Sequence, residues 1–326
     1  MRIAIIGAIN FDSLEFHIHD ELSFLGHDCK IFDFDNFFPP KVEWGFTLAF
    51  ESYAVFKNKI LLRNVLQFNP ELVIVTYRNI HPFVVKEIKN NRIKIISLNP
   101  DALTQFQSQQ LFVEPYDVYF SKDPYTVRFL KDNLKFNVFL YHEAFNSRFI
   151  TNEINDYKRL EMELGIDVLS FGTFYPYRNR FLSLLKQKGV NLTLYGTKAK
   201  YFDSSLDNNL IKKKIYGDEK IKILNGSKIV FNNFHYAEIE SVNNKFFEIF
   251  GYGAFQICDY RPILNEILPI DPRLVSFKNF DEAEKLIFHY LNNPEKRYEI
   301  RKMVSNHFKE FYSYKNLVLF ILEKSV

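Results

Sequence analysis

The chain has 326 residues, a formal net charge of +3 and 47% hydrophobic residues. This length exceeds the size at which a single hydrophobic core usually keeps growing, so two domains of about 150 residues are expected. The small, dispersed positive charge argues against a nucleic-acid partner and is compatible with at most a weak membrane association. The two cysteines, Cys29 and Cys258, lie in different halves, so we expect no disulfide and a reducing compartment.

The first elements predict the start of a parallel sheet. Residues 2–8 (RIAIIGA) form an apolar run that is too short for a signal peptide and predicts a buried strand. A helix over 14–25, ended by Gly26, and a strand over 29–35 complete a β-α-β unit. The loop after the first strand lacks the G-x-G-x-x-G pattern, which argues against a dehydrogenase. No apolar run reaches the length of a membrane span, and we expect a cytoplasmic protein.

Two acidic residues, Asp33 and Asp35, follow the second predicted strand and allow three interpretations. They could bind a ribose, form the metal-binding Asp-x-Asp of single-domain glycosyltransferases, or be solvated acids at a strand end. The first requires the missing glycines and the second a different fold, so we favour the third. His17 and His19 lack the i, i+4 spacing of a helical metal pair, and no metal site is expected.

The rest of the first half repeats the alternation of strand and helix. Residues 46–68 predict a helix closed by Asn69-Pro70, residues 125–134 predict another, and strands are expected over 71–78, 94–101, 117–123 and 137–144. Ligands in open α/β sheets lie outside the carboxyl ends of the strands. The polar residues at these ends are Asn10, Tyr77, Arg78, Asn99, Asp101, Lys122, His142 and Glu143.

A polar stretch then separates two series of strands. We expect a first Rossmann-like domain over 1–150, a linker over 151–166 and a second Rossmann-like domain over 167–305. Within the second domain, strands are predicted over 167–174, 191–197 and 227–234, with a helix over 177–187. A last helix over 308–324 lies in the segment 306–326, which we expect to cross back onto the first domain.

The stretch 237–259, AEIESVNNKFFEIFGYGAFQICD, carries most of the functional argument. Ser241 is the expected helix cap, Gly251 and Gly253 are the expected end, and a buried strand follows over 254–258. A helix N-terminus offers free N–H groups and a partial positive charge, which suit a phosphate or diphosphate. The residues expected to form this anion site are Ser241, Asn243, Asn244 and Lys245.

Two glutamates flank the expected anion site. Glu240 and Glu248 are eight residues apart, or about 12 Å along a helix axis. This distance is similar to the length of a sugar–diphosphate–ribose unit. Two glutamates at this spacing also occur on ordinary solvated helices, but here a Ser-x-Asn-Asn-Lys start, two glycines and a buried strand accompany them.

The Glu-x7-Glu spacing before a glycine turn and a strand resembles the donor-site signature of glycosyltransferases with the two-domain GT-B fold. More narrowly, SKIVFNNF followed by ESVNNKFFEIFGYGAFQICDY resembles the CgeB-like (spore maturation protein B-like) glycosyltransferases over residues 227–260, with a looser match over 170–197. The resemblance implies two Rossmann-like domains with a cleft between them and a nucleotide diphosphate sugar as co-substrate. It also implies that no metal or other cofactor is needed and that the sugar configuration is retained.

The resemblance also implies roles for individual residues. Glu248 would hold the ribose and Glu240 the donor sugar, while Arg178, after the first strand of the second domain, would face the diphosphate. A surface salt bridge is the alternative for Arg178, and solvation or capping for the others. The remaining residues are Gly172 and Tyr216 on the donor side, Asp101 and then His142 as catalytic candidates from the first domain, and Asn10, Arg78 and Glu143 on the acceptor side.

The sequence is therefore interpreted as an α/β glycosyltransferase with an unknown glycan, lipid or protein acceptor. One alternative is a nucleotide-sugar 2-epimerase on the same fold, which would need more acids and histidines than the second domain offers. Another is a non-catalytic two-lobed ligand-binding protein, which is usually exported. The sequence does not specify the sugar, the base, the acceptor or the oligomeric state.

Overall fold

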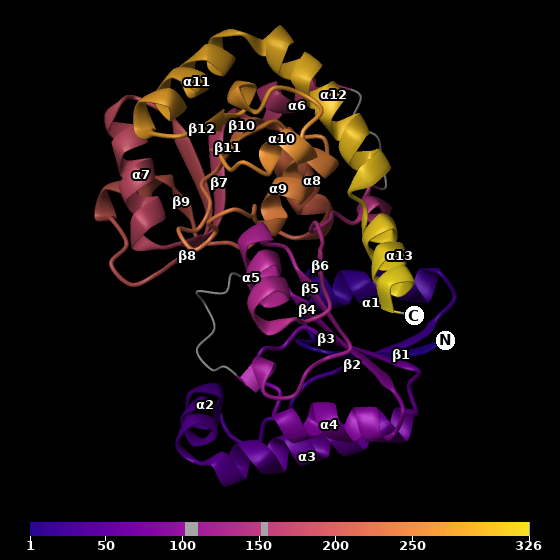
Figure 1. Ribbon diagram of the computed structural model, residues 1–326. Helices are drawn as coiled ribbons and strands as arrows, with labels where there is room; N and C mark the ends of the chain where they lie inside the picture. Colours follow the sequence, from indigo (N-terminus) through magenta and orange to yellow (C-terminus); the bar gives the residue numbers. More distant parts are fainter. Residues whose placement is uncertain (102–109, 151–155, 326) are drawn as a thin grey trace. The chain divides into compact units, whose positions relative to one another are not determined.

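The computed structural model describes residues 1–101, 110–150 and 156–325 (Figure 1). The chain forms two compact units. Unit 1 consists of Met1–His142 together with Lys315–Val326, and unit 2 is Glu143–Tyr314. The units divide near 142 and 314, whereas the sequence predicted boundaries at 150, 166 and 305.

Unit 1 contains a six-stranded sheet in the order β2-β1-β3-β4-β5-β6, and all of its strand pairs are parallel. Its strands are β1 (Arg2–Ile6), β2 (Asp28–Phe32), β3 (Leu72–Val75), β4 (Lys94–Asn99), β5 (Val118–Ser121) and β6 (Val138–Leu140). Helices cover both faces, with α3 (Glu51–Phe68) and α4 (Pro82–Asn90) below the sheet in Figure 1 and α1 (Leu14–Phe24) above it. Strands covered on both faces read as apolar runs, which is why the sequence predicts them.

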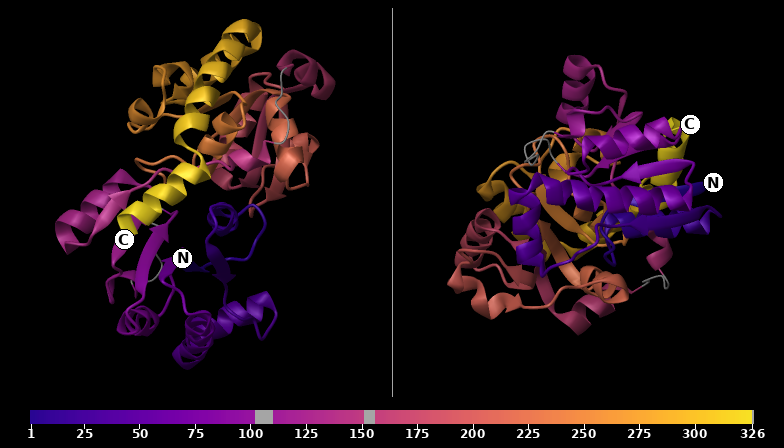
Figure 2. Two further views of the ribbon diagram at one scale, coloured as in Figure 1. Left: turned by 90° about the vertical axis from the view of Figure 1, so that its right-hand side faces the viewer. Right: turned by 90° about the horizontal axis from the view of Figure 1, so that it is seen from below.

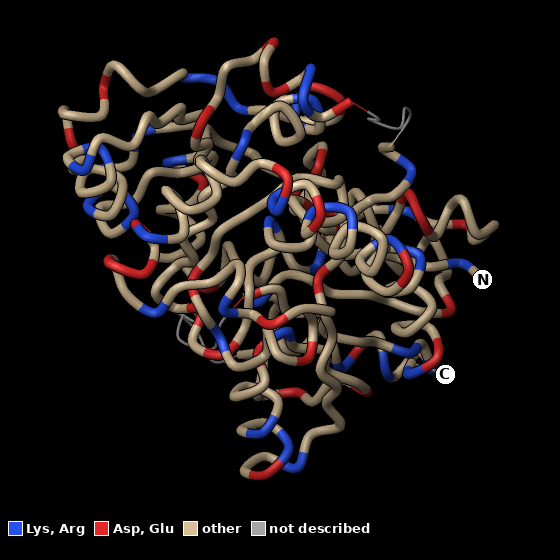
Figure 3. Tube along the Cα trace, turned by 90° about the horizontal axis from the view of Figure 1, so that it is seen from above, with Lys and Arg blue, Asp and Glu red and all other residues tan. Residues whose placement is uncertain are grey.

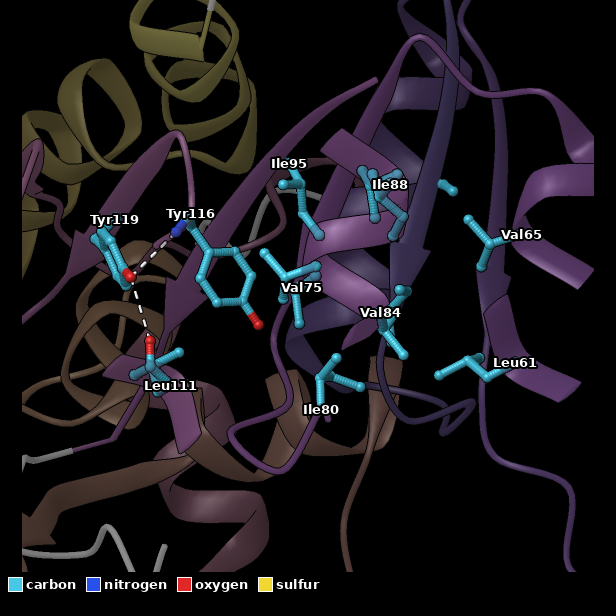
Figure 4. Packing of buried hydrophobic residues seen from close by; sticks show 14 of the residues in the cluster. Leu61, Val65, Val75, Ile80, Val84, Ile88, Ile95, Leu111, Tyr116 and Tyr119 are labelled. Carbon is cyan, nitrogen blue, oxygen red and sulfur yellow. Dashed lines mark hydrogen bonds between the residues drawn. The ribbon is translucent and has the colours of Figure 1, made fainter. Parts of the chain in front are cut away.

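One face of this sheet carries a large hydrophobic core (Figure 4). Val73 and Val75 of β3 point to the same face because side chains alternate along a strand. They lie in one cluster with Leu61 of α3 and Val84 of α4, all of them 2% exposed or less. The cluster also includes Val65, Ile80, Ile88, Ile95, Leu111, Tyr116 and Tyr119.

The predicted helix over 46–68 is in fact two helices, α2 (Pro40–Ala49) and α3. Phe50 separates them with an extended backbone, φ −126° and ψ 102°. Glu43 of α2 stabilises this arrangement, because its buried carboxylate accepts hydrogen bonds from the Tyr53 hydroxyl and the Lys57 ammonium of α3. Hydrophobic periodicity continues through Phe50, so the pattern alone does not reveal the break.

The predicted C-terminal helix is also divided, into α12 (Pro294–Phe311) and α13 (Tyr314–Ser325). At the break, the Phe145 N–H donates to the Tyr312 carbonyl and the Tyr314 N–H donates to the Phe145 carbonyl, each at 3.1 Å. Beyond the break, α13 packs in unit 1 (Figure 1 and Figure 2). The Phe320 ring lies 5.9 Å from the Phe120 ring of β5.

Unit 2 contains a second parallel sheet, in the order β12-β11-β10-β7-β8-β9. Its strands are β7 (Ile166–Phe174), β8 (Leu192–Lys198), β9 (Leu210–Ile211), β10 (Ser227–Asn232), β11 (Gln256–Asp259) and β12 (Ser276–Phe277). The chain runs outward from β7 to β9 and then returns to β10 on the other side of β7. The switch point of this sheet, where ligands bind in open α/β folds, therefore lies between β7 and β10.

The helices of unit 2 are α6 (Tyr157–Leu164), α7 (Pro176–Gln187), α8 (Gly217–Asn225), α9 (Asn244–Gly251), α10 (Leu264–Ile267), α11 (Phe280–Asn292) and α12. The sequence did not predict α6, α8, α10 or α11. Helix α6 occupies much of the predicted linker over 151–166, of which residues 151–155 lie outside the described residues. Its buried Glu161 carboxylate accepts hydrogen bonds from Arg297 at 2.5 Å and Arg301 at 2.9 Å, which ties α6 to α12.

The two sheets confirm the predicted α/β fold class. Positively and negatively charged residues are interspersed along the chain without a large block of one sign (Figure 3). Among the helices of the described residues, none is long and apolar enough to cross a membrane.

Candidate functional site

Two paired glycines lie on β7 and β8, beside the switch point of unit 2. Gly172 of β7 pairs with Gly196 of β8, and both have positive φ, +109° and +145°. A Cβ on Gly196 would overlap the Gly172 carbonyl oxygen, and a Cβ on Gly172 would overlap the Lys245 ammonium. Glycine is therefore required for the close approach of the two strands and of Lys245 to β7.

Arg178 bridges the two strands that flank the switch point. Its guanidinium donates one hydrogen bond to the Thr173 carbonyl of β7 and another to the Asn233 carbonyl just after β10, each at 2.9 Å. The side chain is only 8% exposed, and its burial lowers the pKa of Arg178 while Tyr175 and Asp259 oppose the shift. Arg178 is thus a buried cation with a fixed orientation rather than part of a surface salt bridge.

Helix α9 begins later than predicted, and Ser241 is not its cap. Asn243 is the N-cap and accepts a hydrogen bond from the Phe246 N–H at 3.1 Å, while the Ser241 hydroxyl donates to the Glu238 carboxylate. The Asn243 amide also exchanges two hydrogen bonds of 3.0 Å with the Asn232 amide of β10, which fixes the start of the helix. Glu240 therefore precedes the helix, and the expected 12 Å axial distance between the two glutamates does not apply.

Lys245, in the first turn of α9, reaches back to β7. Its ammonium donates to the Phe171 carbonyl at 2.5 Å and lies 4.6 Å from the centre of the Phe171 ring. Burial and the neighbouring Arg178 lower the pKa of Lys245 well below its ordinary value, and Lys220 adds to this effect while Glu248 opposes it. An anion at this position would oppose this shift, because a neighbouring negative charge favours the charged form of Lys245.

Glu248 is buried on α9 and forms an ion pair with Lys220 of α8. The Lys220 ammonium lies 2.8 Å from a Glu248 carboxylate oxygen, and both side chains are less than 10% exposed. Sequence analysis missed Lys220 because α8 was not predicted and because 28 positions separate it from Glu248. The acidic first turn of α8, Asp218 and Glu219, is a helix-start signal that could have revealed it.

Four of the predicted donor-side residues therefore lie together at the switch point: Gly172, Arg178, Lys245 and Glu248. Lys245 lies against Gly172 and interacts electrostatically with Arg178 and Glu248. With Lys220, the group comprises three basic side chains and one carboxylate, which we call the cation cluster. Asn243 acts as the cap of α9. Tyr216 begins α8 one turn before Lys220, and its carbonyl accepts from the Lys220 N–H.

The first-domain candidates lie at the carboxyl edge of the unit 1 sheet. Arg78 and Asp101 form an ion pair of 3.4 Å, with about a third of each side chain exposed. The Asn99 amide brackets Asp101, donating to its carbonyl at 2.7 Å and accepting from its N–H at 3.3 Å. Asn10 is exposed in the loop after β1.

The predicted residues His142 and Glu143 lie where the chain passes from unit 1 to unit 2. Burial lowers the pKa of His142 to about 4, so its imidazole is neutral near pH 7. Glu143 is buried and belongs to unit 2.

Comparison with known proteins gives a family match and a shared fold. Residues 178–323 match the family model described as Glycosyl transferase-like, whereas no curated protein matches the sequence. A sucrose-phosphate synthase from Thermosynechococcus elongatus is similar with a TM-score of 0.71 and 11% identity, covering 99% of this chain and 97% of that one.

Two further solved structures have the same architecture. HepE from Anabaena, in complex with UDP and glucose, has a TM-score of 0.70 and 11% identity, covering 99% of this chain and 98% of that one. A trehalose-6-phosphate synthase, from a study of glycosyl transfer with retention, has a TM-score of 0.67 and 12% identity, covering 99% of both chains. The chain therefore has the GT-B fold with two Rossmann-like domains and carries a glycosyltransferase-like domain over residues 178–323, which supports a glycosyltransferase enzyme.

Proposed function

We propose that the protein transfers a sugar from a nucleotide diphosphate sugar to an acceptor, with retention of configuration and without a metal ion. The observation that carries this proposal is the cation cluster at the switch point of unit 2, formed around Arg178, Lys245 and Lys220 with Glu248 as its one carboxylate. The family match over the same part of the chain supports it.

The charge balance of the cluster suits a diphosphate. Glu248 compensates one of the three basic side chains, whereas burial and the neighbouring Arg178 lower the pKa of Lys245. The N-terminus of α9 adds backbone N–H groups and the positive end of the helix dipole. A dianionic group would neutralise the remaining positive charge of the cluster.

Asn244 offers a further contact at the same helix start. Its side-chain oxygen is buried and accepts no hydrogen bond from any residue that the structure describes. A buried acceptor without a donor is unfavourable by about 1–3 kcal/mol. We infer that a hydroxyl group of the bound donor, on its sugar or ribose, supplies this hydrogen bond.

The cluster would promote the chemical step by stabilising the leaving group. When the bond between the sugar and the diphosphate breaks, negative charge increases on the departing phosphate oxygen. Arg178 is held by two carbonyls before the ligand arrives, so it stabilises this charge without reorganising. In this proposal Glu248 binds ribose hydroxyls, Glu240 contacts the donor sugar, and His142 or Asp101 contacts the sugar from the first domain.

The structural neighbours suggest which donor to test first. HepE was solved with UDP and glucose, and the trehalose-6-phosphate synthase study concerns transfer with retention. The first observation supports a uridine nucleotide sugar as the donor of this chain, and the second supports a retaining reaction. Asn10, Arg78 and Glu143 are the residues proposed for the acceptor side.

The test is calorimetric titration of the full chain with UDP, GDP, dTDP and ADP. We expect at least one nucleoside diphosphate to bind, and Lys245→Met to weaken it by about 10- to 140-fold, which corresponds to a charge-assisted hydrogen bond of about 1.5–3 kcal/mol. Lys222→Met is the matched control, because Lys222 lies on α8 but pairs with Glu163 at the surface. If no nucleotide binds, or if both variants lose affinity equally, the proposal is wrong.

A further inference from the structure

Unit 1 contains a pocket of about 810 Å³ at the carboxyl edge of its sheet. It is lined by segments that follow β2 and β3 and by side chains of α2 and α3. Its volume lies in the range of roughly 300–1,000 Å³ that is usual for small-molecule sites. Neither the cation cluster nor the predicted acceptor-side residues line it.

A hydrogen-bonded pair fixes the base of this pocket. One oxygen of the Asp33 carboxylate accepts from the Tyr77 hydroxyl at 2.5 Å and from the Phe34 N–H at 2.7 Å. The rings of Phe34 and Tyr77 stack with centroids 5.7 Å apart and an interplanar angle of 10°. The second oxygen of Asp33 has no hydrogen-bond partner within the described part of the chain. Asp33 is therefore held in place with one acceptor open.

Three side chains that can donate hydrogen bonds line the same pocket as Asp33. His81 is the N-cap of α4, and its Nδ1 accepts from the Phe83 N–H at 3.3 Å. Because Nδ1 accepts this bond, Nε2 is the ring nitrogen that can donate. The Asn79 amide and the Trp44 indole N–H also line the pocket and have no hydrogen-bond partner among the residues described.

Trp44 adds an aromatic face to this arrangement. Its side chain is 66% exposed on α2 and lines the pocket. The face of an aromatic ring carries partial negative charge, so it attracts the weakly positive C–H groups on one face of a pyranose. Sugar-binding sites combine such an aromatic face with polar side chains that exchange hydrogen bonds with the sugar hydroxyls. The pocket contains an aromatic face, Trp44, and polar side chains of this kind.

The charges of the pocket select against an acidic ligand. Among the residues that line it, Lys57 is the one lysine or arginine, and its ammonium is paired with Glu43. Two carboxylates, Asp33 and Glu51, also line the pocket. A phosphate, uronate or sialyl group would therefore meet uncompensated negative charge, which is unfavourable.

We propose that this pocket binds a neutral sugar unit of the acceptor, so that the acceptor is a glycan or glycoside. The assignment rests on the proposed glycosyltransferase function. Asp33 and His81 contact hydroxyl groups, and Trp44 stacks on the sugar ring. Exposed apolar residues of α2, such as Leu48 at 63%, lie at the rim of the pocket.

The first experiment is a printed array of neutral, uronate-containing and sialylated oligosaccharides probed with the labelled full chain. Hits are confirmed by saturation-transfer-difference NMR, with maltose, lactose and chitobiose at 10 mM as additional probes. We expect binding to neutral oligosaccharides and loss of about tenfold or more in affinity for Trp44→Ala. Trp44→Phe should recover part of the loss, and Asp33→Asn should weaken binding.

The matched control is Phe24→Ala, which removes an equally exposed aromatic ring, 67% against 66%, from α1 of the same unit. It should leave sugar binding unchanged. Melting temperatures of the Trp44 variants should equal that of the wild type, because Trp44 is mostly exposed.

Three results would overturn the proposal: no neutral sugar binding in either assay, preference for acidic glycans, or equal binding by wild type and Trp44→Ala. Binding to lipid vesicles that depends on Trp44, with no sugar binding, would assign the pocket to a lipid instead. The nucleotide titration of the wild type separates the two proposals. Sugar binding without nucleotide binding would refute the glycosyltransferase function and leave a sugar-binding site, whereas nucleotide binding without sugar binding would refute only the pocket.

Discussion

Substitution of Gly172 by alanine tests whether the position of the Lys245 ammonium matters for nucleotide binding. Gly172 has φ +109°, and an added Cβ would overlap that ammonium. The backbone strain lowers stability by roughly 1–3 kcal/mol. The flexible lysine moves aside at little additional cost in stability, but it no longer lies beside β7. We expect nucleoside diphosphate affinity to fall by about 10- to 140-fold, the loss of one charge-assisted hydrogen bond of about 1.5–3 kcal/mol.

Gly189→Ala is the control for the backbone strain. Gly189 also has positive φ, +84°, and a Cβ there meets nothing within 4 Å. It should lower stability by a similar amount and leave nucleotide affinity unchanged. Denaturant unfolding and calorimetric titration of both variants give the two quantities separately. Equal affinities of Gly172→Ala and Gly189→Ala would show that the lysine position has no part in binding.

Binding of a diphosphate should raise the lowered pKa of Lys245. The affinity for the diphosphate should therefore fall as pH rises through the pKa that Lys245 has in the ligand-free protein. Calorimetric titrations in buffers of different ionisation enthalpy should show proton uptake on binding, and Lys245→Met should abolish this uptake. If Glu248 holds the ribose, Glu248→Gln should weaken binding of the bare nucleotide and of the full donor equally. Stronger nucleotide binding together with a lower melting temperature would show that Glu248 serves only in its ion pair with Lys220. Glu240→Gln should leave nucleotide affinity unchanged and reduce turnover about tenfold for each 1.4 kcal/mol of transition-state contact; unchanged turnover would remove Glu240 from the site. Glu161→Gln leaves two buried arginines short of a partner and should lower the unfolding free energy by about 3–5 kcal/mol, measured in denaturant, and an unchanged midpoint would contradict this.

Most strands of both sheets could be predicted because a strand covered on both faces reads as an uninterrupted apolar run. The two-residue edge strands β9 and β12 carry too little pattern to detect. Breaks inside helices were also missed. Phe50 keeps the hydrophobic period, and the break there is stabilised by hydrogen bonds from Tyr53 and Lys57 to the Glu43 carboxylate. The sequence predicted a helix start near residue 241 but gave Ser241 as its cap instead of Asn243. The position of Asn243 is fixed by hydrogen bonds to the Asn232 amide of β10, which the local sequence does not reveal.

The candidate site shows the same division between local and long-range information. The Gly172, Arg178 and Lys245 positions follow from strand ends and helix starts, which are local features. The pairing of Glu248 with Lys220 depends on how α8 packs beside α9. The pocket around Asp33 was not predicted, because the solvated-acid interpretation did not include its partner Tyr77, 44 positions away. Partners brought together only by tertiary packing leave no periodic pattern in the sequence.

The order in which the chain is synthesised places a constraint on unit 1. Its main part ends at His142, yet residues 315–326 complete it, and at about 5–20 residues per second these follow roughly 10–40 s later. Until then the Phe120 ring of β5 lacks Phe320, so an apolar patch on the face of the sheet is open to aggregation or to a chaperone. A fragment that stops at residue 142 would keep that defect permanently, so the two units cannot be produced separately by cutting the gene between them. A soluble first unit would require residues 315–326 to be joined to it through a short linker.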